Sequence, residues 1–420
     1  MTGGARISRR SALAGLAAAA AAPWAGVRVG FAQTGAAGPG DAGPARLALV
    51  LLRGGLDGLA LLPPHGDPSY RTVRGRLALP APGGVGGVID LDGTFGLHPA
   101  ALGLLRFWSA GRLAVAPAAA GPYRGTEGVM RHADARRAFA TGTARPDGPG
   151  AESGWLNRAL ARAGGGPPAL ALAGAGVPAV LAGPVAAQAA AQAAPPAVLG
   201  APVRGLMQKA ALLYQGDALL GPALAQAARR RARPAESLGA AHVAEADAGA
   251  RSPFELAAAA HHAGRRLAEP GGPRVAVIEA AGFDSHFGPV HRTERRIAAL
   301  AGGLAALADG LGEAFAETVI LAASEFGRAA APNAAGGTDH GLAGPLLLLG
   351  GPVQGGIKGA WPGLAAERLA PNGGVAPSLD ARAVLKAVLA GHWGLNGAQL
   401  DAVFPDARTV APAAGLLRRG

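Results

Sequence analysis

Runs of apolar residues that end at glycine or at a charged residue recur along the chain and predict buried strands. The first run, Leu47–Leu52, ends just before Gly54 and Gly55. A second run, Leu113–Pro117, follows a stretch of helical character from Pro99 to Ser109. An apolar run without polar alternation is typical of a strand that is covered on both faces of a sheet. The N-terminal half therefore predicts at least two strands of a buried sheet.

The C-terminal half repeats this pattern more clearly. Three short apolar runs predict strands at 274–279, 318–323 and 345–350. Between the first two of these runs, apolar residues recur at helical spacing and predict a helix with a core-facing stripe: Ile297, Leu300, Leu304, Leu307 and Leu311. Strand, helix and strand in succession predict an α/β fold with a mostly parallel central sheet and helices on both faces.

The N-terminus has the pattern of a twin-arginine export signal. Arg9 and Arg10 precede a short apolar stretch of small residues, Ala14–Ala22, which Pro23 interrupts. This stretch is shorter than the ~20 apolar residues of a spanning helix, so we expect no membrane span. Small residues before Gln33 predict cleavage after Ala32. The alternative is an alanine-rich N-terminal helix that is never removed.

These signals predict the organisation of the chain. We expect an export signal over residues 1–32, a Gly/Ala/Pro-rich linker over 33–45 and a single folded domain over 46–420. The mature protein is then expected in the periplasm or outside the cell, exported through the twin-arginine pathway.

Composition excludes several classes of function. The chain has no cysteine, so neither disulfides nor thiolate chemistry are available. The formal net charge is +12, but the one dense basic run, Arg229–Arg233, has no aromatic residue nearby. A nucleic-acid interface combines clustered basic residues with aromatic side chains, so we expect no nucleic-acid partner.

Polar side chains follow the predicted strands and supply the candidate chemistry. Four clusters stand out, at 53–58, 282–286, 324–328 and 336–341. Because parallel strands place their carboxyl ends at one edge of the sheet, we expect six acidic and imidazole groups to meet there: Asp57, Asp284, His286, Glu325, Asp339 and His340.

A mixed set of carboxylate and imidazole groups predicts a divalent transition metal as cofactor, with zinc or manganese the leading candidates. Calcium and magnesium prefer shells made only of oxygen ligands. Without a metal ion, several carboxylates at one site would repel one another. The alternative for each residue taken singly is a helix cap or a turn, which short polar side chains form routinely.

The same clusters, in the same order, resemble the bacterial family of unknown function numbered 1501, whose members are often exported through the twin-arginine pathway. The resemblance spans nearly the whole mature chain and rests on eight short motifs: Val50–Gly58, Pro68–Tyr70, Phe95–Pro99, Gly154–Asn157, Phe283–His286, Ser324–Arg328, Gly337–Gly341 and Trp361–Leu364. It implies an alkaline-phosphatase-like fold, similar to that of the alkaline phosphatase and sulfatase superfamily.

The resemblance also implies metal ligands. Asp57 resembles the aspartate ligand that follows the first strand, Asp284 and His286 resemble a later pair, and His340 resembles the last histidine, with Asp339 beside it. Glu325 could still serve as a ligand, but the next residue, Phe326, stands where many superfamily members have histidine.

Besides Phe326, the chain departs from the pattern of the resembled family at the position of the nucleophile. Where the resembled family has a Ser-His pair, this chain has Arg131 and His132, and Thr126 is a hydroxyl five residues away. The sequence therefore assigns no nucleophile.

Two functions follow from these features. The first is a metal-dependent hydrolase of phosphate or sulfate esters, whose partner is a small-molecule ester. The alternative is a non-catalytic member of the fold that binds a cell-surface component or acts in assembly.

Overall fold

The computed structural model describes residues 27–33, 45–125, 129–163, 169–173, 178–183, 253–287 and 290–418. All of them belong to one compact unit. The arginine pair and apolar stretch of the predicted export signal lie outside the described residues, as does most of the predicted linker.

A mixed sheet lies at the centre of this unit, and within the described residues it has nine strands. In chain order they are β1 (Val27–Gln33), β2 (Arg46–Leu52), β5 (Leu113–Ala120), β6 (Ala169–Ala173), β7 (Val275–Ala280), β8 (Thr318–Ser324), β9 (Gly344–Gly350), β10 (Gly356–Ile357) and β11 (Leu379–Asp380). The order across the sheet is β10-β5-β9-β8-β2-β7-β1-β6, and β11 pairs with β5. A separate small hairpin joins β3 (Ile89–Asp90) and β4 (Gly96–Leu97).

Most strands of the sheet run in one direction, as the sequence predicts. Strands β7 and β8 are both parallel to β2, whereas β1 and β9 run the opposite way. The strand predicted at 345–350 is thus present as β9 but is antiparallel to its neighbours. A parallel connection requires a crossover, usually a helix, and the chain between β8 and β9 contains none.

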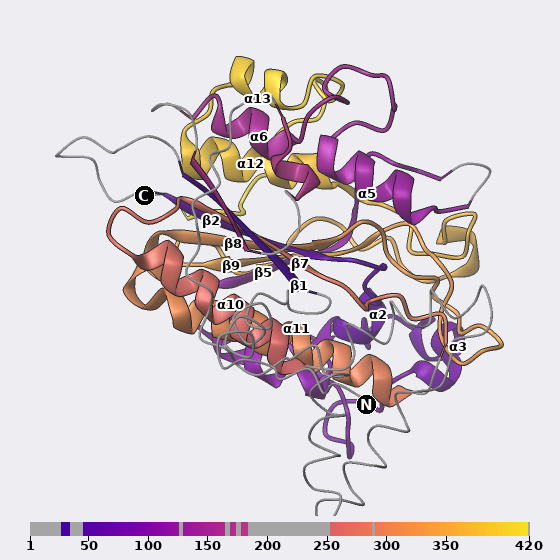
Figure 1. Cartoon of the computed structure of the whole chain (residues 1–420). Helices are drawn as coiled ribbons and strands as arrows, with labels where there is room; N and C mark the ends of the chain where they lie inside the picture. Colours follow the sequence, from indigo (N-terminus) through magenta and orange to yellow (C-terminus); the bar gives the residue numbers. More distant parts are fainter. Residues whose placement is uncertain are drawn as a thin grey trace, which may run out of the picture. The chain divides into compact units, whose positions relative to one another are not determined.

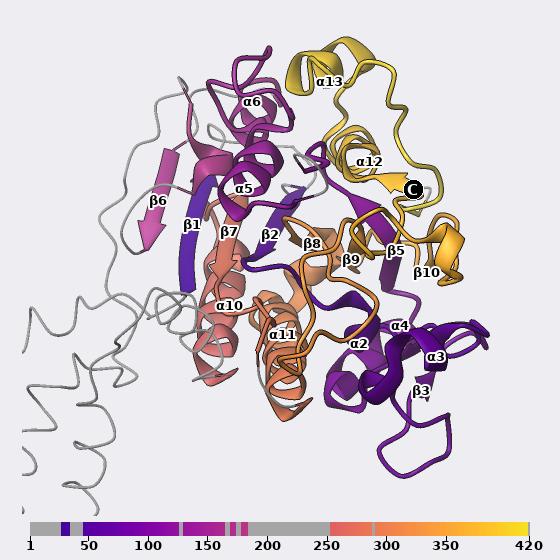
Figure 2. The same ribbon diagram turned by 90° about the vertical axis from the view of Figure 1, so that its right-hand side faces the viewer.

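Helices cover both faces of the sheet, which confirms the predicted α/β architecture (Figures 1 and 2). One face carries α5 (His132–Thr141), α6 (Trp155–Leu160), α12 (Ala381–Trp393) and α13 (Gly397–Val403). The other carries α2 (Gly58–Leu61), α3 (Tyr70–Arg74), α4 (Leu105–Ser109), α10 (Pro253–Ala268) and α11 (Val290–Leu311). Short 3₁₀ segments complete the elements: η1 (Gly75–Leu77), η2 (Pro99–Leu104), η3 (Ala179–Leu181), η4 (Gly312–Glu317) and η5 (Ala366–Arg368).

The core explains why the strands are apolar throughout. Leu47, Leu49 and Leu51 of β2 are buried in one cluster with Trp155 and Phe404. The intervening residues of β2 point to the opposite face and are buried as well. Because both faces of β2 are covered, neither set of positions can be polar.

The predicted helical stripe forms the buried face of α11. Its five residues, Ile297, Leu300, Leu304, Leu307 and Leu311, are all at most 2% exposed. The segment Arg292–Glu317 is long and apolar enough to cross a membrane by composition, and it is the one such segment among the described residues. Half of its most apolar window is buried inside the unit, where α11 packs beside α10 and η2 as a core helix.

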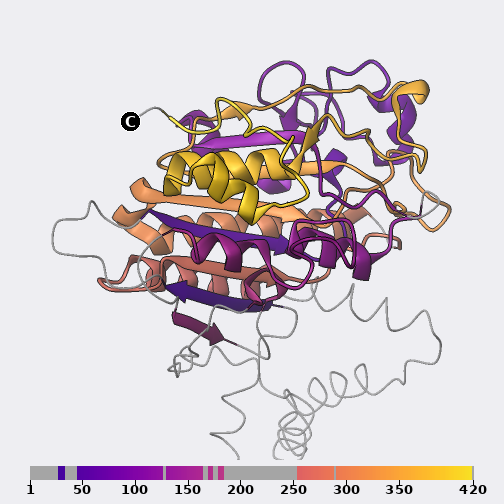
Figure 3. The ribbon, with the colours of Figure 1, turned by 90° about the horizontal axis from the view of Figure 1, so that it is seen from above.

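Strand β1 comes from the end of the predicted export signal. It pairs antiparallel with β7 on one side and with β6 on the other. Figure 3 shows β1 and β6 along one edge of the sheet. These seven residues therefore contribute backbone hydrogen bonds to the sheet in the full-length chain.

Candidate metal centre

Three neighbouring strands end at the same level and create the platform for the site. Leu52 of β2 lies opposite Ala280 of β7 and opposite Ser324 of β8. The three chains that leave these strands therefore start side by side at one edge of the sheet. This is the edge at which ligands bind in open α/β sheets.

Two glycines let these chains approach each other closely. Gly54 and Gly55 have φ angles of 120° and 87°, which side chains rarely adopt. A Cβ atom on Gly54 would lie 2.3 Å from the backbone nitrogen of Asp284, and one on Gly55 would lie 2.7 Å from the ring of Phe326. The glycine pair after β2 is thus required for the loops after β7 and β8 to pack against it.

The loop before β9 docks onto the same platform. The backbone N–H of Thr338 donates to the carbonyl oxygen of Ser285 over 2.9 Å, and the two side-chain hydroxyls lie 3.2 Å apart. Arg328, whose side chain is buried, donates to the carbonyl oxygen of Thr338. These contacts place Asp339 and His340 next to Asp284 and His286.

Asp284 is the centre of the cluster. Its Oδ1 accepts a hydrogen bond of 2.9 Å from Arg328. Burial alone would raise the pKa of the Asp284 carboxyl, but the neighbouring rings of His132 and His340 and the charge of Arg328 hold this pKa far below its usual range. The carboxylate is therefore ionised at any physiological pH.

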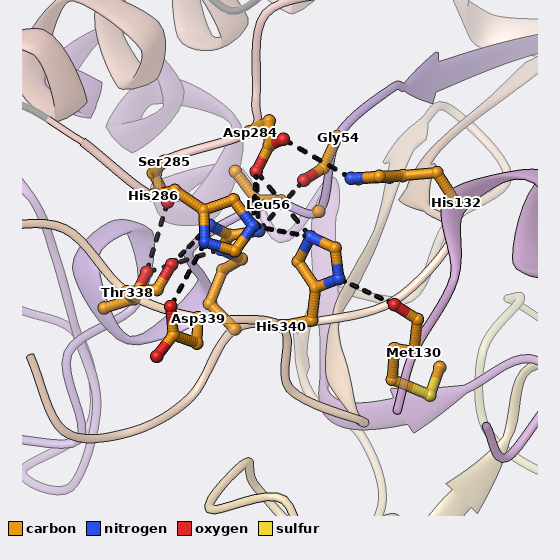
Figure 4. Close-up of polar contacts among 12 residues, drawn as sticks. Gly54, Leu56, Met130, His132, Asp284, Ser285, His286, Thr338, Asp339 and His340 are labelled. Atoms are coloured by element: carbon orange, nitrogen blue, oxygen red, sulfur yellow. Dashed lines mark hydrogen bonds and ion pairs between the residues drawn. The ribbon is translucent and has the colours of Figure 1, made fainter. Parts of the chain in front are cut away.

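Three histidine rings turn their Nε2 atoms toward this carboxylate (Figure 4). The Nε2 atoms of His286 and His340 lie 3.3 Å and 3.8 Å from Asp284 Oδ1, and that of His132 lies 3.4 Å from Oδ2. One ligand atom each from His132, Asp284 and His340 lie within 4.8 Å of one another. The four side chains are between 15% and 28% exposed, so the cluster is half-buried but open to solvent.

Each ring is held through its other nitrogen. The Nδ1 atom of His132 lies 3.1 Å from Glu325 Oε1, that of His286 lies 3.1 Å from Asp339 Oδ1, and that of His340 lies 2.7 Å from the carbonyl oxygen of Met130. All three oxygens can only accept, so each Nδ1 carries the proton. Histidines that bind metals are oriented in this way, by donating their second N–H to a carboxylate or a carbonyl.

The contact between His286 and His340 tests whether a metal ion fits. Their Nε2 atoms lie 2.8 Å apart, and the ring of His340 already donates from Nδ1. Burial and the charge of Arg328 lower the pKa of His286, which favours the neutral ring, with its proton on Nδ1. When His340 too carries a single proton, on Nδ1, two lone pairs face each other over a short distance. A bound cation would convert this repulsion into coordination, so the donor set fits a transition metal.

Residues 129–404 match the sequence profile of a family described as "protein of unknown function (DUF1501)". The chain belongs to this family. The matched range contains all four residues of the cluster, whereas the glycine pair after β2 precedes it. A search of curated proteins and a search of solved structures found no match. DUF1501 membership names no activity, so function has to be argued from the site.

The structure brings three of the six predicted site residues together directly: Asp284, His286 and His340. Two others, Glu325 and Asp339, each contact the Nδ1 atom of one histidine ring of the cluster. Glu325, whose side chain is fully buried, accepts from the Gly54 N–H, from His132 and from Arg136 through its Oε1 atom. Asp339, which is largely exposed, accepts from His286 and from Asn333. Both carboxylates therefore orient histidines of the cluster.

Asp57 has a different environment. Its carboxylate forms a buried ion pair with Arg74 and also accepts the N–H of Ala60 at the start of α2. Both oxygens of Asp57 are thus used by the protein. This is the helix-capping role that the sequence leaves open as the alternative for each residue.

His132 completes the cluster and was not among the predicted ligands. It is the first residue of α5 and reaches Glu325 across a sequence separation of 193 residues. Burial alone would lower the pKa of His132, but the hydrogen bonds that its ring donates to the carboxylates of Asp284 and Glu325 raise it to about 9. The only sequence signal was its place beside Arg131 in the stretch compared with the Ser-His pair of the resembled family.

The side chains of Phe326 and Ser324 have structural contacts next to the cluster. The ring of Phe326 packs against those of His132 and His340, with centroids 4.9 Å and 4.6 Å apart, and forms an apolar wall. Ser324 donates to the carbonyl oxygen of Leu52 and accepts two backbone N–H groups, so its hydroxyl is engaged. Thr126, the other hydroxyl considered from the sequence, lies outside the described residues.

The Glu325–His132 contact yields a first prediction. Replacing Glu325 with glutamine keeps the shape of the side chain but removes the charge that holds Nδ1 of His132, so zinc affinity should fall about 10–100-fold. Competition with a chromophoric chelator measures this change. Glu317→Gln is the matched control, because Glu317 is an exposed, ion-paired glutamate just before the opposite end of β8. An affinity within twofold of the parent protein would show that Glu325 does not orient a ligand.

Proposed function

We propose that this DUF1501 protein is a hydrolase of phosphate or sulfate esters that depends on one divalent transition metal ion, zinc or manganese. The observation that carries the proposal is the convergence of three Nε2 atoms on Asp284, with every Nδ1 held by a protein acceptor.

The donor set supports a transition metal. His132, His286 and His340 would supply nitrogen and Asp284 oxygen. Imidazole suits zinc and other first-row transition metals, whereas calcium and magnesium take mainly oxygen ligands. Glu325 and Asp339 lie behind the rings, which favours a single ion over a pair. A metal ion bound there would lower the pKa of a water molecule and polarise a phosphoryl or sulfuryl oxygen.

The protein's own residues would fix the geometry. Arg328 holds the Asp284 carboxylate in place, and Glu325, Asp339 and the Met130 carbonyl set the three ring orientations. Because the hydroxyls of Ser285, Ser324 and Thr338 are bonded within the protein, we assign the attack on the ester to water. The bond from phosphorus or sulfur to the alcohol oxygen then breaks, and the alcohol leaves with a proton.

One observation favours a second function. Three imidazoles and one carboxylate are four donors, which is enough to fill the tetrahedral shell of a structural zinc ion. In that case the metal would stabilise a non-catalytic binding or assembly protein, with a cell-surface component as its partner.

Elemental analysis and an ester assay separate these functions. We expect the purified full chain to contain about one zinc or manganese ion per molecule. We also expect it to hydrolyse 4-nitrophenyl phosphate or 4-nitrophenyl sulfate, to lose turnover with a chelator and to regain it with the metal. One bound metal without turnover of either ester would favour the scaffold. Folded protein that binds neither metal, even after incubation with excess zinc or manganese, would contradict both functions.

We also propose that the protein is exported through the twin-arginine pathway, on the basis of Arg9, Arg10 and the short apolar stretch that follows. A route that carries folded cargo suits a protein that holds a metal ion. Fractionation of cells that produce the parent chain or an Arg9→Lys, Arg10→Lys variant tests export, because the variant should remain in the cytoplasm.

A further inference from the structure

Two residues with exposed apolar side chains adjoin residues of the metal centre along the chain. Phe287 and Val129 are each 56% exposed, and they are two of four large hydrophobic residues with exposed side chains in the part of the chain that the structure describes. Phe287 directly follows His286, and their ring centroids lie 6.2 Å apart. Val129 directly precedes Met130, whose carbonyl oxygen holds His340. Of the two, Phe287 is the residue whose ring lies beside a histidine of the centre, so the rim is apolar at this point.

The backbone on either side of His286 is firmly held. Phe287 pairs with Gly336 in an isolated bridge, and the carbonyl oxygen of His286 accepts a hydrogen bond of 3.0 Å from Asn333. The neighbouring Ser285 is bonded to Thr338 through both its backbone and its side chain. The Phe287 ring thus projects toward solvent from a well-anchored backbone. What distinguishes Phe287 from other exposed apolar residues is its place, with its ring beside that of His286 at the metal centre.

The centre combines this apolar rim with a polar interior. Phe326, which is 3% exposed, backs the rings of His132 and His340, while Asp284 and the Nε2 atoms form the polar part. An ester of a phosphate or sulfate with an apolar alcohol has the matching two-part character. Its anionic group suits the metal centre, and its apolar group can stack on an aromatic ring at the 4.5–7 Å typical of such pairs.

We infer that Phe287 contacts the leaving group of the substrate, so that the protein prefers phosphate or sulfate esters of aromatic alcohols to those of small alcohols. This inference rests on the proposed hydrolase function. It assigns a specificity-determining role to Phe287, which lies next to the metal centre and outside its ligand set.

Kinetics with two esters test this assignment. For phenyl phosphate, Phe287→Ala should lower kcat/KM about tenfold, mainly through KM, whereas for methyl phosphate kcat/KM should stay within twofold. The corresponding sulfates are used if the protein acts on sulfates. Phe287→Tyr keeps an aromatic ring and should retain the preference for the phenyl ester. Val85→Ala is the matched control, since Val85 is fully exposed on the loop between η1 and β3.

The outcomes distinguish this inference from the function on which it rests. An equal change for both esters in Phe287→Ala, or no change for either, overturns the role of Phe287 and leaves the hydrolase in place. Absence of turnover by the parent protein with any of these esters overturns the hydrolase and, with it, the preference. Metal content, measured for each variant, should remain at the parent value because Phe287 is exposed and supplies no ligand.

Discussion

Replacing His132 with alanine should lower zinc affinity by more than about 100-fold, because the loss of a ligand exceeds the 10–100-fold effect of losing a residue that orients one. The fold should survive this change, since Glu325 keeps its hydrogen bonds from the Gly54 N–H and from Arg136. Competition with a chromophoric chelator gives the affinity, and circular dichroism reports the fold.

His65→Ala provides the matched control for this variant. His65 also lies against a carboxylate, 2.8 Å from Asp90, but in a solvent-exposed pair elsewhere in the chain. Its removal should leave zinc affinity unchanged. Wild-type affinity in His132→Ala would show that Asp284, His286 and His340 hold the metal without His132, and the three-histidine centre would be wrong.

Replacing Gly337 with alanine should destabilise the protein by about 3 kcal/mol, the upper end of the range for overpacking a buried site. The new Cβ atom would lie 1.9 Å from the carbonyl oxygen of Ser285 and 2.6 Å from the carbonyl carbon of His286, so the two loops would have to separate. Because these loops carry three of the four ligands, zinc affinity should fall as well. Urea unfolding measures the free energy, and chelator competition measures the affinity.

Gly302→Ala is the opposite case and serves as control. Gly302 lies within α11, and a Cβ atom there would have no neighbour within 4 Å. Alanine at an exposed helical position should stabilise the protein by about 0.5–1 kcal/mol. If Gly337→Ala were as stable as the parent protein, the loop after β7 and the loop before β9 would not be packed backbone to backbone.

The strands and the main core helix could be predicted because their signals are local. The runs at 47–52, 113–117, 274–279, 318–323 and 345–350 all lie in or overlap strands of the sheet, and the stripe from Ile297 to Leu311 is the buried face of α11. Burial on both faces of a sheet forces unbroken apolar runs, and a helix on a sheet forces helical spacing. The direction of β9 could not be predicted from its own residues, because it depends on whether the chain between β8 and β9 crosses the sheet.

The sequence also predicted where the candidate site lies, but not which of its residues are ligands. Parallel strands that end at one level bring their following residues together, which is why Asp284 and His286 lie at this edge of the sheet, whereas His340 reaches them from the loop before the antiparallel strand β9. The same reasoning could not separate ligands from the residues that orient them. Glu325 follows a strand just as Asp284 follows one, yet its side chain is buried behind His132.

By itself, then, the sequence determined the α/β class, the strand positions and the edge of the sheet at which the polar groups gather. Only the tertiary structure decided how those groups divide: Asp57 pairs with Arg74, Glu325 and Asp339 hold rings, and His132 arrives from the start of α5. The physical reason is that hydrophobic periodicity is set within one element. The direction of a loop side chain depends instead on close contacts between distant segments, such as those at Gly54 and Gly337.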